Sequence, residues 1–295
     1  MPWARRWNSA VVQAPRSQRY RMDECIGIGA FGSVHRGYDA NLEREVAIKV
    51  PHCAPGSGLG DALWEEARAL ARVSHPNVVG VYDIASLDSI GMIDPDSDSS
   101  SIPIMVMEFV EGWPLHEWIR EHRPSLARTL ALFTQVASGL VATHEHGVVH
   151  GDVKLSNMVL GADGRVRLLD FGFASSLGSR IGGTERAFMG SPGYMAPELL
   201  ESRFFDERSD QYAFGTSVYY ALYGRLPFFG LSISELTYVK KANAPGFLDR
   251  SDTRGRLEDL LRRCLAAEPE GRFSSMREVR DELRWILRRM SSPAQ

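Results

Sequence analysis

The sequence predicts an α+β protein with two lobes. Strand patterns fill the N-terminal third of the chain, helical patterns fill the remainder, and the change falls near residues 108–113, where we expect the hinge. The chain has 295 residues. This exceeds the ~100–200 residues typical of one domain, so two domains or one large two-lobed domain would fit. Its 44% hydrophobic and 24% charged residues indicate an ordinary globular protein with a core of good size.

Three strands are expected after a leader of residues 1–18. The leader shows no hydrophobic periodicity and is expected to be flexible. The strand patterns are YRMDECIG (20–27), SVHRGYDA (33–40) and EREVAIKV (43–50). A glycine turn would join the first two strands, and the polar ANLE would join the second to the third.

A helix and two more strands complete the strand-rich part. Asp61 is a good N-cap for a helix over residues 62–73. The apolar face of that helix would carry Leu63, Ala67, Leu70 and Val73. Residues 75–84 predict a turn and then a strand, and residues 102–110 predict a buried strand. The polar, serine-rich stretch 86–101 between them predicts a mobile loop.

Helical patterns dominate beyond residue 113. The stretch 126–147 predicts a long helix, because apolar residues recur at helical spacing. These residues are Leu126, Leu130, Phe133, Val136, Leu140 and Val141. Short strands and turns are expected over 148–172, and helices from Pro197 onwards, before a tail of residues 291–295.

Charge and cysteine content argue against a nucleic-acid-binding protein and against a disulfide-rich or zinc-binding one. A net charge of -3 and a pI near 6.3 argue against a protein that mainly binds nucleic acid. Cys25, Cys53 and Cys264 are too few for a disulfide framework and form no zinc-type cluster, so a reducing compartment is expected. The N-terminus lacks a signal-peptide pattern, and no run of ~18 apolar residues occurs. We therefore expect a cytoplasmic protein, with no membrane span in the chain as given.

Lysine is sparse in this sequence. Only four lysines occur, at Lys49, Lys154, Lys240 and Lys241, while arginine supplies the other basic side chains. Where arginine serves as the ordinary cation, an isolated lysine suggests a site that needs a compact ammonium group. Lys49 and Lys154 are the two isolated lysines and hence the candidates.

The first candidate motif is GIGAFGSV (27–34), a G-x-G-x-x-G-x-V pattern between two predicted strands. Glycines let the backbone approach phosphates and direct N–H groups at them. The same spacing marks dinucleotide-binding folds, but there a helix should follow the last glycine, whereas VHRGYDA continues as a strand. A glycine-rich hairpin without a ligand is the alternative for this motif alone.

The second candidate is Lys49, which ends the motif VAIK (46–49). A buried lysine there needs a carboxylate partner, and Glu66 lies on the inner face of the predicted helix, four residues before Leu70. An ammonium group so held can neutralise the α- and β-phosphate oxygens of ATP. A surface lysine and a solvated glutamate would explain either residue alone, but not the pair in this order and spacing.

The third candidate combines HGDVKLSN (150–157) with LLDFG (168–172). Asp152 would accept a hydroxyl proton, and Asn157 and Asp170 would be ligands of magnesium. Phosphoryl transfer needs little beyond positioning, charge neutralisation and one such proton acceptor. Taken singly, each of these residues could instead be a turn residue that caps its own backbone.

In order and spacing, these motifs resemble the eukaryotic-like protein kinase family, in its bacterial serine/threonine form, over roughly residues 20–290. The shared features are the glycine loop, the strand lysine, the helix glutamate, the His-x-Asp loop, Asp-Phe-Gly and Ala-Pro-Glu. The resemblance implies a kinase domain over 19–290 with a bilobal fold. Its N-lobe (about 19–110) would be an antiparallel sheet plus one helix, and its C-lobe (about 113–290) mainly helical.

The resemblance also implies ATP in the cleft between the lobes, together with Mg²⁺, or Mn²⁺ as the alternative. Met107 would be the gatekeeper, and Glu108 and Val110 would contact adenine through their backbones. Val34, Ala47 and Val159 would sandwich the base. The complete set of implied ATP contacts is Ile26, Gly27, Gly29, Gly32, Val34, Ala47, Lys49, Met107, Glu108, Val110 and Val159.

The class of acceptor is argued from the residues around Gly151. Aminoglycoside-type kinases share His-Gly-Asp, but they usually follow it with a His-Pro-Gly-Asn-like run and lack a segment that presents a peptide. Here GSPGYMAPE (190–198) resembles the protein-kinase shelf beneath the substrate residue that follows the phosphoacceptor, with Ser191 as its Ser/Thr. Lys154 holds the position that contacts the transferring phosphate in Ser/Thr kinases. We therefore expect a signalling Ser/Thr protein kinase, with a small-molecule kinase or a nucleotide-binding pseudokinase as the alternatives.

Two further matches and one departure complete the resemblance. Asp210 resembles the residue that anchors the catalytic loop, and Arg272 resembles the buried partner of Glu198. The departure is Gly151, because an arginine there normally pairs with a phosphate on the activation segment. We therefore expect a non-RD enzyme that autophosphorylates but does not strictly require a phosphorylated activation segment. The available acceptors are Ser175, Ser176, Ser179, Thr184 and Ser191.

Overall fold

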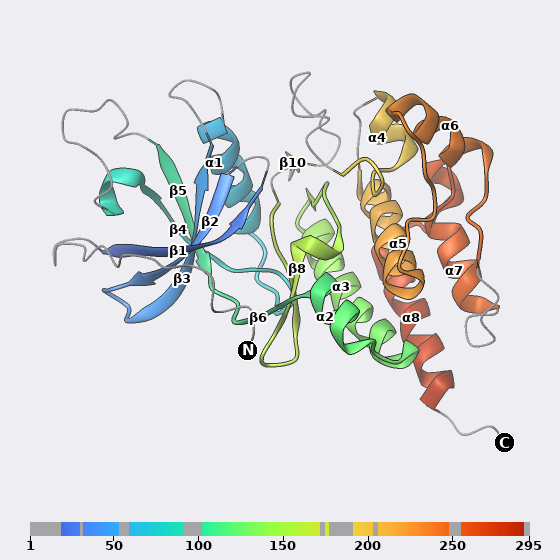
Figure 1. Cartoon of the computed structure of the whole chain (residues 1–295), viewed down its shortest axis with the longest axis horizontal. Helices are drawn as coiled ribbons and strands as arrows, with labels where there is room; N and C mark the ends of the chain where they lie inside the picture. Colours follow the sequence, from blue (N-terminus) through green and yellow to red (C-terminus); the bar gives the residue numbers. More distant parts are fainter. Residues whose placement is uncertain are drawn as a thin grey trace. The chain divides into compact units, whose positions relative to one another are not determined.

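The computed structural model describes residues 19–29, 32–52, 59–90, 102–171, 175–176, 191–202, 206–247 and 255–291. The chain divides into two compact units (Figure 1). The first unit comprises residues up to Ala71 together with Gly80–Val110, and the second comprises Arg72–Val79 and everything from Glu111 onwards. An antiparallel sheet in the first unit and a mainly helical second unit confirm the predicted fold class.

The first unit is built on a five-stranded sheet of order β1-β2-β3-β5-β4, with every neighbouring pair antiparallel. The strands are β1 (Tyr20–Ile28), β2 (Gly32–Asp39), β3 (Arg44–Pro51), β4 (Val81–Ser86) and β5 (Pro103–Glu108). Side chains alternate between the two faces of a strand. One face therefore carries a buried apolar cluster, formed by Tyr20, Val46, Ile48, Ile90, Ile104 and Val106.

The loop predicted over 86–101 is partly wrong. Residues Leu87–Ile90 form a short 3-10 helix, η2, and Ile90 is 4% exposed in the apolar cluster of the sheet. Burial of this one isoleucine fixes the start of a segment whose polar composition favoured a loop. Residues 91–101 lie outside the described residues.

Helix α1 (Leu59–Leu70) begins three residues earlier than expected and also ends three residues earlier. Asp61 is therefore inside the helix and is not its N-cap. Gly60 is a poor helix former, costing about 1 kcal/mol against alanine. Burial of the apolar face at Leu63, Ala67 and Leu70 outweighs such a cost and sets the extent of the helix.

The second unit contains most of the helices. They are α2 (Leu115–His122), α3 (Leu126–Glu145), α4 (Pro197–Ser202), α5 (Glu207–Tyr223), α6 (Ile233–Ala242), α7 (Arg256–Cys264) and α8 (Met276–Ser291), with the short 3-10 helices η4 (Leu155–Asn157) and η7 (Pro269–Gly271). This agrees with the helical patterns predicted at 126–147 and beyond Pro197.

Short strands in the second unit shape the region of the candidate site. Three of them form a small sheet of order β6-β8-β9, and two more form the pair β10-β7. Their bounds are β6 (Gly112–Pro114), β7 (Val148–Val149), β8 (Met158–Gly161), β9 (Val166–Leu168) and β10 (Ser175–Ser176). Residues 72–79, which the sequence placed in the N-lobe, belong to this unit, where Val78 forms a β-bridge with Leu168.

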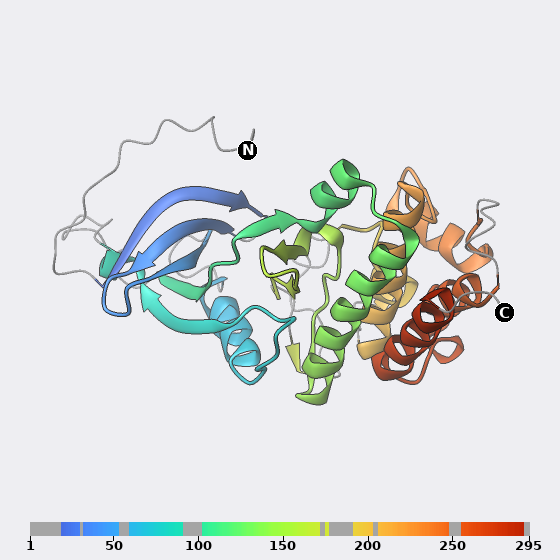
Figure 2. The same cartoon turned by 90° about the horizontal axis from the view of Figure 1, so that it is seen from below.

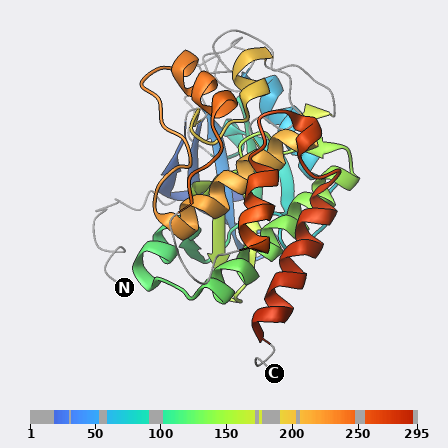
Figure 3. The ribbon, with the colours of Figure 1, turned by 90° about the vertical axis from the view of Figure 1, so that its right-hand side faces the viewer.

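Helix α3 is the central helix of the second unit. Among the described residues, it is the one helix whose length and apolar composition would allow a membrane crossing. More than half of that window, 56%, is buried inside the protein. The helix packs against α5 and α8 (Figures 2 and 3). A buried core helix has the same composition, so packing accounts for the apolar character of α3.

Candidate active site

The three glycines of the predicted phosphate loop differ in what they pack against. A Cβ on Gly32 would lie 2.3 Å from the carbonyl oxygen of Val50, so no side chain fits there. A Cβ on Gly27 would meet no other atom within 4 Å, and one on Gly29 would lie 3.7 Å from the oxygen of Gly32. Packing of the described residues therefore requires glycine at position 32 only. For Gly27 and Gly29, the role of letting a ligand approach the backbone stays a prediction.

The side chains predicted around adenine in the first unit share one face of the sheet. Val34 lies opposite Lys49 in the β2-β3 pair, and Ala47 lies opposite Met107 in the β3-β5 pair. Directly opposed residues of antiparallel strands lie on the same face, as do residues two apart. This face is the one opposite the apolar cluster. Ile26, by contrast, lies on β1 and is 48% exposed.

The backbone N–H and the side chain of Glu108 already form hydrogen bonds with Gly80. Its N–H donates to the carbonyl of Gly80 at 2.8 Å, and its Oε2 accepts from the N–H of Gly80 at 3.4 Å. The predicted backbone contact of Glu108 with adenine therefore concerns its carbonyl oxygen. Val110 ends the first unit, and Val159 lies on β8 of the second unit, opposite Arg167.

Lys49 and Glu66 form the predicted pair. The Lys49 ammonium lies 2.8 Å from both carboxylate oxygens of Glu66. Each residue is 5% exposed, so the pair is buried between β3 and α1. A buried charge is stable only when it is paired and hydrogen-bonded. The contact therefore fixes α1 against the sheet and holds an ammonium group at a defined place on the candidate face.

In the second unit, three predicted residues form one hydrogen-bonded group. Lys154 Nζ donates to Asp152 Oδ2 at 2.6 Å, and Asn157 Nδ2 donates to the same oxygen at 3.0 Å. Asn157 Nδ2 also donates to the backbone carbonyl of Asp152 at 3.0 Å. These contacts orient the Asp152 carboxylate and place a positive charge beside it. Because both contacts of Asn157 use Nδ2, its Oδ1 is the atom that it can offer to a cation.

Asp170 is fixed to this group through its neighbour Leu169. The Leu169 N–H donates to the carbonyl of Asn157 at 2.8 Å, and the Leu169 carbonyl lies 3.1 Å from His150 Nε2. Asp170 itself has a φ of 56°, in the left-handed region that few non-glycine residues adopt. Backbone strain of this kind concentrates at functional sites, where surrounding contacts maintain it.

The donors at Asn157 and Asp170 suit magnesium in kind. Mg²⁺ is held in proteins by one or two carboxylates together with substrate phosphates and water. One carboxylate and one amide oxygen on adjoining segments match that pattern. The residues that the structure describes contain no group of three or more His, Cys, Asp or Glu with metal-binding geometry, so a metal here would depend on substrate phosphates as well.

His150 has a structural role in the predicted catalytic loop. Its Nδ1 accepts from the N–H of Asp152 at 3.2 Å, so the proton lies on Nε2, which donates to the carbonyl of Leu169 at 3.1 Å. Complete burial lowers the pKa of His150, although the nearby carboxylates oppose the shift. The ring contacts that of Phe171, with centroids 4.2 Å apart. His150 is therefore neutral. Its ring lies between the loop and the Asp-Phe-Gly segment and contacts both.

Asp210 holds the start of the loop 150–157, the contact that the sequence predicted. Its carboxylate accepts from the N–H groups of His150 and Gly151 at 2.8 and 2.9 Å. It also lies 2.8 Å from His144 Nε2 at the end of α3, a partner that the sequence analysis missed. Burial alone would raise the pKa of Asp210, but the hydrogen bonds and the charge of His144 lower it. Asp210 therefore stays ionised and joins α5, α3 and the loop.

Gly151 has a backbone reason to be glycine. Its φ is 77°, in the region that costs an L side chain roughly 1–2 kcal/mol. A small hollow lies beside it, lined by Gly151, Asp152, Val153, Tyr194, Met195, Ala196, Leu199, Ser209, Asp210 and Ala213. The glycine thus removes strain as well as the arginine side chain found in many kinases.

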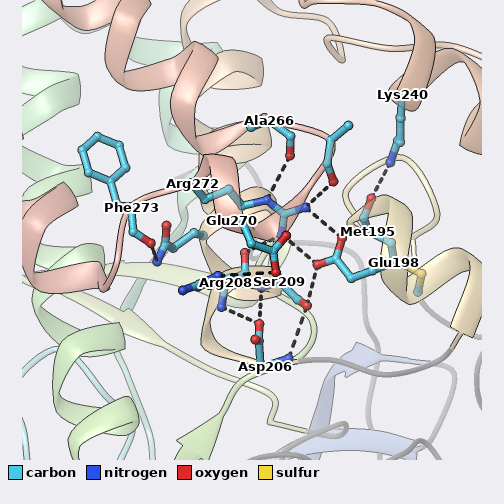
Figure 4. Close-up of polar contacts among 12 residues, drawn as sticks. Met195, Glu198, Asp206, Arg208, Ser209, Lys240, Ala266, Glu270, Arg272 and Phe273 are labelled. Atoms are coloured by element: carbon cyan, nitrogen blue, oxygen red, sulfur yellow. Dashed lines mark hydrogen bonds and ion pairs between the residues drawn. The ribbon is translucent and has the colours of Figure 1, made fainter.

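Glu198 and Arg272 form the predicted buried pair (Figure 4). Arg272 Nη1 and Nη2 donate to the two carboxylate oxygens of Glu198 at 2.7 and 2.8 Å. The remaining donors reach the carbonyls of Ala266, Ala267 and Arg208 at 3.0, 3.0 and 2.9 Å. All five N–H groups of the guanidinium are therefore satisfied. Through them Arg272 joins the start of α4 to α5 and to the segment after α7.

Lys240 was not a candidate in the sequence analysis, because Lys241 lies next to it and only the two isolated lysines were taken as candidates. The structure separates the two residues. Lys241 lies at the surface and forms an ion pair with Glu201 at 3.1 Å. Lys240 is 1% exposed, and its ammonium group points into the chain segment before α4 (Figure 4). The sparse use of lysine was the available signal, and it applied to Lys240 as well.

Some predicted residues lie outside the described part of the chain. These are the leader 1–18, Cys53, and the possible phosphoacceptors Ser179 and Thr184. Ser175 and Ser176 form β10, which pairs with Val148–Val149, and Ser191 begins the next described segment. Cys25 is exposed and Cys264 is buried, and both are free thiols.

Comparison with known proteins identifies the relatives of this chain. A family profile described as "Protein kinase domain" matches residues 20–284. The serine/threonine-protein kinase PknB of Mycolicibacterium smegmatis is 30% identical over 275 residues, which cover 90% of this chain and 43% of PknB. PksC of Streptomyces coelicolor and pkn2 of Myxococcus xanthus, also serine/threonine-protein kinases, are 33% and 34% identical. The chain covers 48% and 32% of their lengths, so it spans less than half of each of these relatives.

Proposed function

This chain belongs to the protein kinase family, and from that premise we propose that it transfers the γ-phosphoryl group of ATP to serine or threonine hydroxyls of proteins. The observation that carries the proposal is the group formed by Asp152, Lys154 and Asn157, with hydrogen bonds of 2.6 and 3.0 Å converging on one carboxylate oxygen. The Asp210 carboxylate holds the start of the same loop by accepting hydrogen bonds from the N–H groups of His150 and Gly151. Such an arrangement positions one base and one cation for a transfer that needs little else.

In the proposed reaction, Asp152 accepts the proton of the attacking hydroxyl. The hydroxyl oxygen bonds to the γ-phosphorus while the bond from phosphorus to the bridging oxygen of ADP breaks. Lys154, whose ammonium lies 2.6 Å from Asp152 Oδ2, would stabilise the negative charge on the transferring group. Lys49, held by Glu66, would neutralise the α- and β-phosphates.

The nucleotide and metal contacts are part of the same proposal. When bound, Mg²⁺ supplies charge neutralisation of the phosphate oxygens. Asn157 Oδ1 and the Asp170 carboxylate would hold it, and Mn²⁺ could replace it. The adenine contacts would be those implied by the family resemblance, with the shared face of Val34, Ala47 and Met107 supporting that assignment. We propose that residues 19–290 form the kinase domain. Because the reaction consumes ATP, we also propose that this domain lies in the cytoplasm.

The proposal is tested by incubating the purified protein with radiolabelled ATP and three kinds of acceptor: a generic basic protein, a peptide library and an aminoglycoside panel. Label is expected on serine or threonine of protein or peptide, and none on the aminoglycosides. Lys49→Ala and Asp170→Asn are expected to lower incorporation by at least ~100-fold, the lower limit for loss of one group that acts in the transition state. Full activity of Asp170→Asn would refute the catalytic role, and label on aminoglycosides alone would favour the small-molecule alternative.

Regulation without an arginine before Asp152 gives a separate prediction. Gly151 carries no side chain that could pair with an activation-segment phosphate, so that phosphate has lost its usual partner. A variant with Ser175, Ser176, Ser179 and Thr184 all changed to alanine is expected to keep kcat within about threefold of wild type, although autophosphorylation on those residues would disappear. The measurement compares initial rates of peptide phosphorylation. Loss of activity in this variant, with recovery on acidic substitution, would show that phosphorylation is required after all.

A further inference from the structure

The ammonium group of Lys240 donates hydrogen bonds to three backbone carbonyl oxygens. Lys240 lies on α6, and its Nζ donates to the carbonyl oxygens of Pro192, Gly193 and Met195 at 2.9, 3.1 and 2.5 Å. All three acceptors belong to residues 191–195, which we call the shelf turn because the family resemblance assigns this segment to the substrate shelf. Figure 4 shows Lys240 reaching Met195 next to the Glu198–Arg272 pair.

A lysine suits this place better than an arginine. An ammonium group has three N–H donors on one small centre, and three carbonyls converge on it here. A guanidinium is planar and spreads its donors over a wider fork. Since this sequence uses arginine almost everywhere else, the lysine indicates a geometric requirement of the site.

The ammonium is placed there at an energetic cost. Burial lowers the pKa of Lys240 to about 7, while the charge of Glu198 acts in the opposite direction. The Tyr212 ring, with its centroid 5.2 Å from Nζ, offers a further favourable contact. A methionine-like side chain would fill the same volume without the cost of a charge, so packing alone does not account for a lysine.

Among the described residues, the backbone N–H groups of the shelf turn that form hydrogen bonds do so within the turn itself. The N–H of Tyr194 closes it by donating to the carbonyl of Ser191 at 2.9 Å. Apolar contacts hold two other points: Met195 packs with Val149 and Leu199, and a Cβ on Gly193 would lie 2.6 Å from Leu226 Cδ1. Lys240 thus supplies the described hydrogen bonds that tie the turn to another helix.

We propose that Lys240 is a positioning residue that holds the shelf turn in the shape that binds a protein substrate, independently of phosphorylation of the activation segment. The inference rests on the proposed function, and it names a regulatory feature of the same site. In kinases with an arginine before the catalytic aspartate, a phosphate can order the activation segment through that arginine. Gly151 removes this route, and Lys240 attaches the last part of the segment through three backbone carbonyls without any phosphate.

The test compares Lys240→Met with the matched control Lys241→Met. Removing charge-assisted hydrogen bonds from the shelf turn is expected to raise the KM for a peptide substrate by about tenfold or more, while the KM for ATP stays within about twofold. Lys241→Met, which removes the exposed neighbour, is expected to leave both KM values unchanged. Lys240→Arg is expected to behave like Lys240→Met, because charge without the compact geometry does not restore three contacts.

Amide hydrogen exchange of the shelf turn gives a readout that does not depend on activity. The amides of Tyr194 and Met195 should exchange faster in Lys240→Met than in Lys241→Met. Unchanged peptide KM and unchanged exchange would overturn the proposal, and so would an equal rise of both KM values, which would indicate a general loss of stability. If Lys240→Met does not fold, Lys240→Gln, which has no charge and only two N–H donors for three carbonyls, takes its place with the same criteria. A wild-type protein that transfers no phosphate would defeat the proposed function, whereas the exchange comparison would still test the attachment.

Discussion

Replacing Asp152 with asparagine is expected to lower kcat for peptide phosphorylation by about 10²–10⁴-fold, the range for loss of a positioned proton acceptor. The amide can occupy the same space but cannot accept the hydroxyl proton at neutral pH. Asp152 Oδ2 already receives Lys154 Nζ at 2.6 Å and Asn157 Nδ2 at 3.0 Å. The amide oxygen of asparagine can still accept from both donors, but it carries no charge, so the Lys154 ammonium group would be held less strongly beside residue 152.

The control for this prediction is Asp259→Asn, which makes the same chemical change at an exposed position on α7. Its kcat and both KM values are expected to match wild type. Steady-state kinetics with varied ATP and peptide separate the effects, because loss of a proton acceptor lowers kcat whereas a misplaced nucleotide raises the KM for ATP. A kcat for Asp152→Asn within threefold of wild type, in a folded protein, would remove Asp152 from the role of base.

The elements with clear periodicity could be predicted from the sequence. The long helix expected at 126–147 is α3 (Leu126–Glu145), because apolar residues on one face of it are buried, among them Leu130, Phe133 and Val136. Strands β1 to β3 also appear within two residues of their predicted bounds. Boundaries were less accurate where packing overrode local preference, as at the start of α1, where Asp61 has the chemistry of a cap but lies inside the helix.

The candidate site was predictable where its residues sit within a motif, and less so where they meet across the fold. Asp152, Lys154 and Asn157 lie within six residues of one another, and the structure shows them in contact. His144 lies outside any motif, and its contact with Asp210 depends on how α3 packs on α5. Spacing along the chain contains no information about that packing, so such partners appear only in three dimensions.

Lys240 shows how a sound rule can miss a residue. The rule that a lone lysine indicates a compact-ammonium site judged isolation along the sequence. In the structure, Lys240 and Lys241 point to different environments, one buried under the shelf turn and one at the surface beside Glu201. Adjacent residues of a helix are about 100° apart around its axis, so a sequence neighbour need not share its surroundings.

Replacing Arg272 with methionine is expected to lower the free energy of unfolding by about 3–5 kcal/mol, because the Glu198 carboxylate loses its partner and three backbone carbonyls lose their donor. The Arg272 side chain is fully buried, while Glu198 is 19% exposed, so most of the cost falls on the lost hydrogen bonds to Glu198 and to three carbonyls. For a chain of this size, the melting temperature should fall by roughly 10 °C. Thermal and urea unfolding of the purified variant measure the loss.

Arg272→Lys tests whether charge or geometry matters at this position. A single ammonium group has three donors, whereas Arg272 uses five across Glu198, Ala266, Ala267 and Arg208. We therefore expect Arg272→Lys to recover less than half of the lost stability. Arg165→Met is the control, since Arg165 is 60% exposed and lies 3.9 Å from Asp163, and an exposed pair contributes about 0–1 kcal/mol. If Arg272→Lys were as stable as wild type, charge alone would hold this part of the fold, and the five-donor geometry would have no special importance.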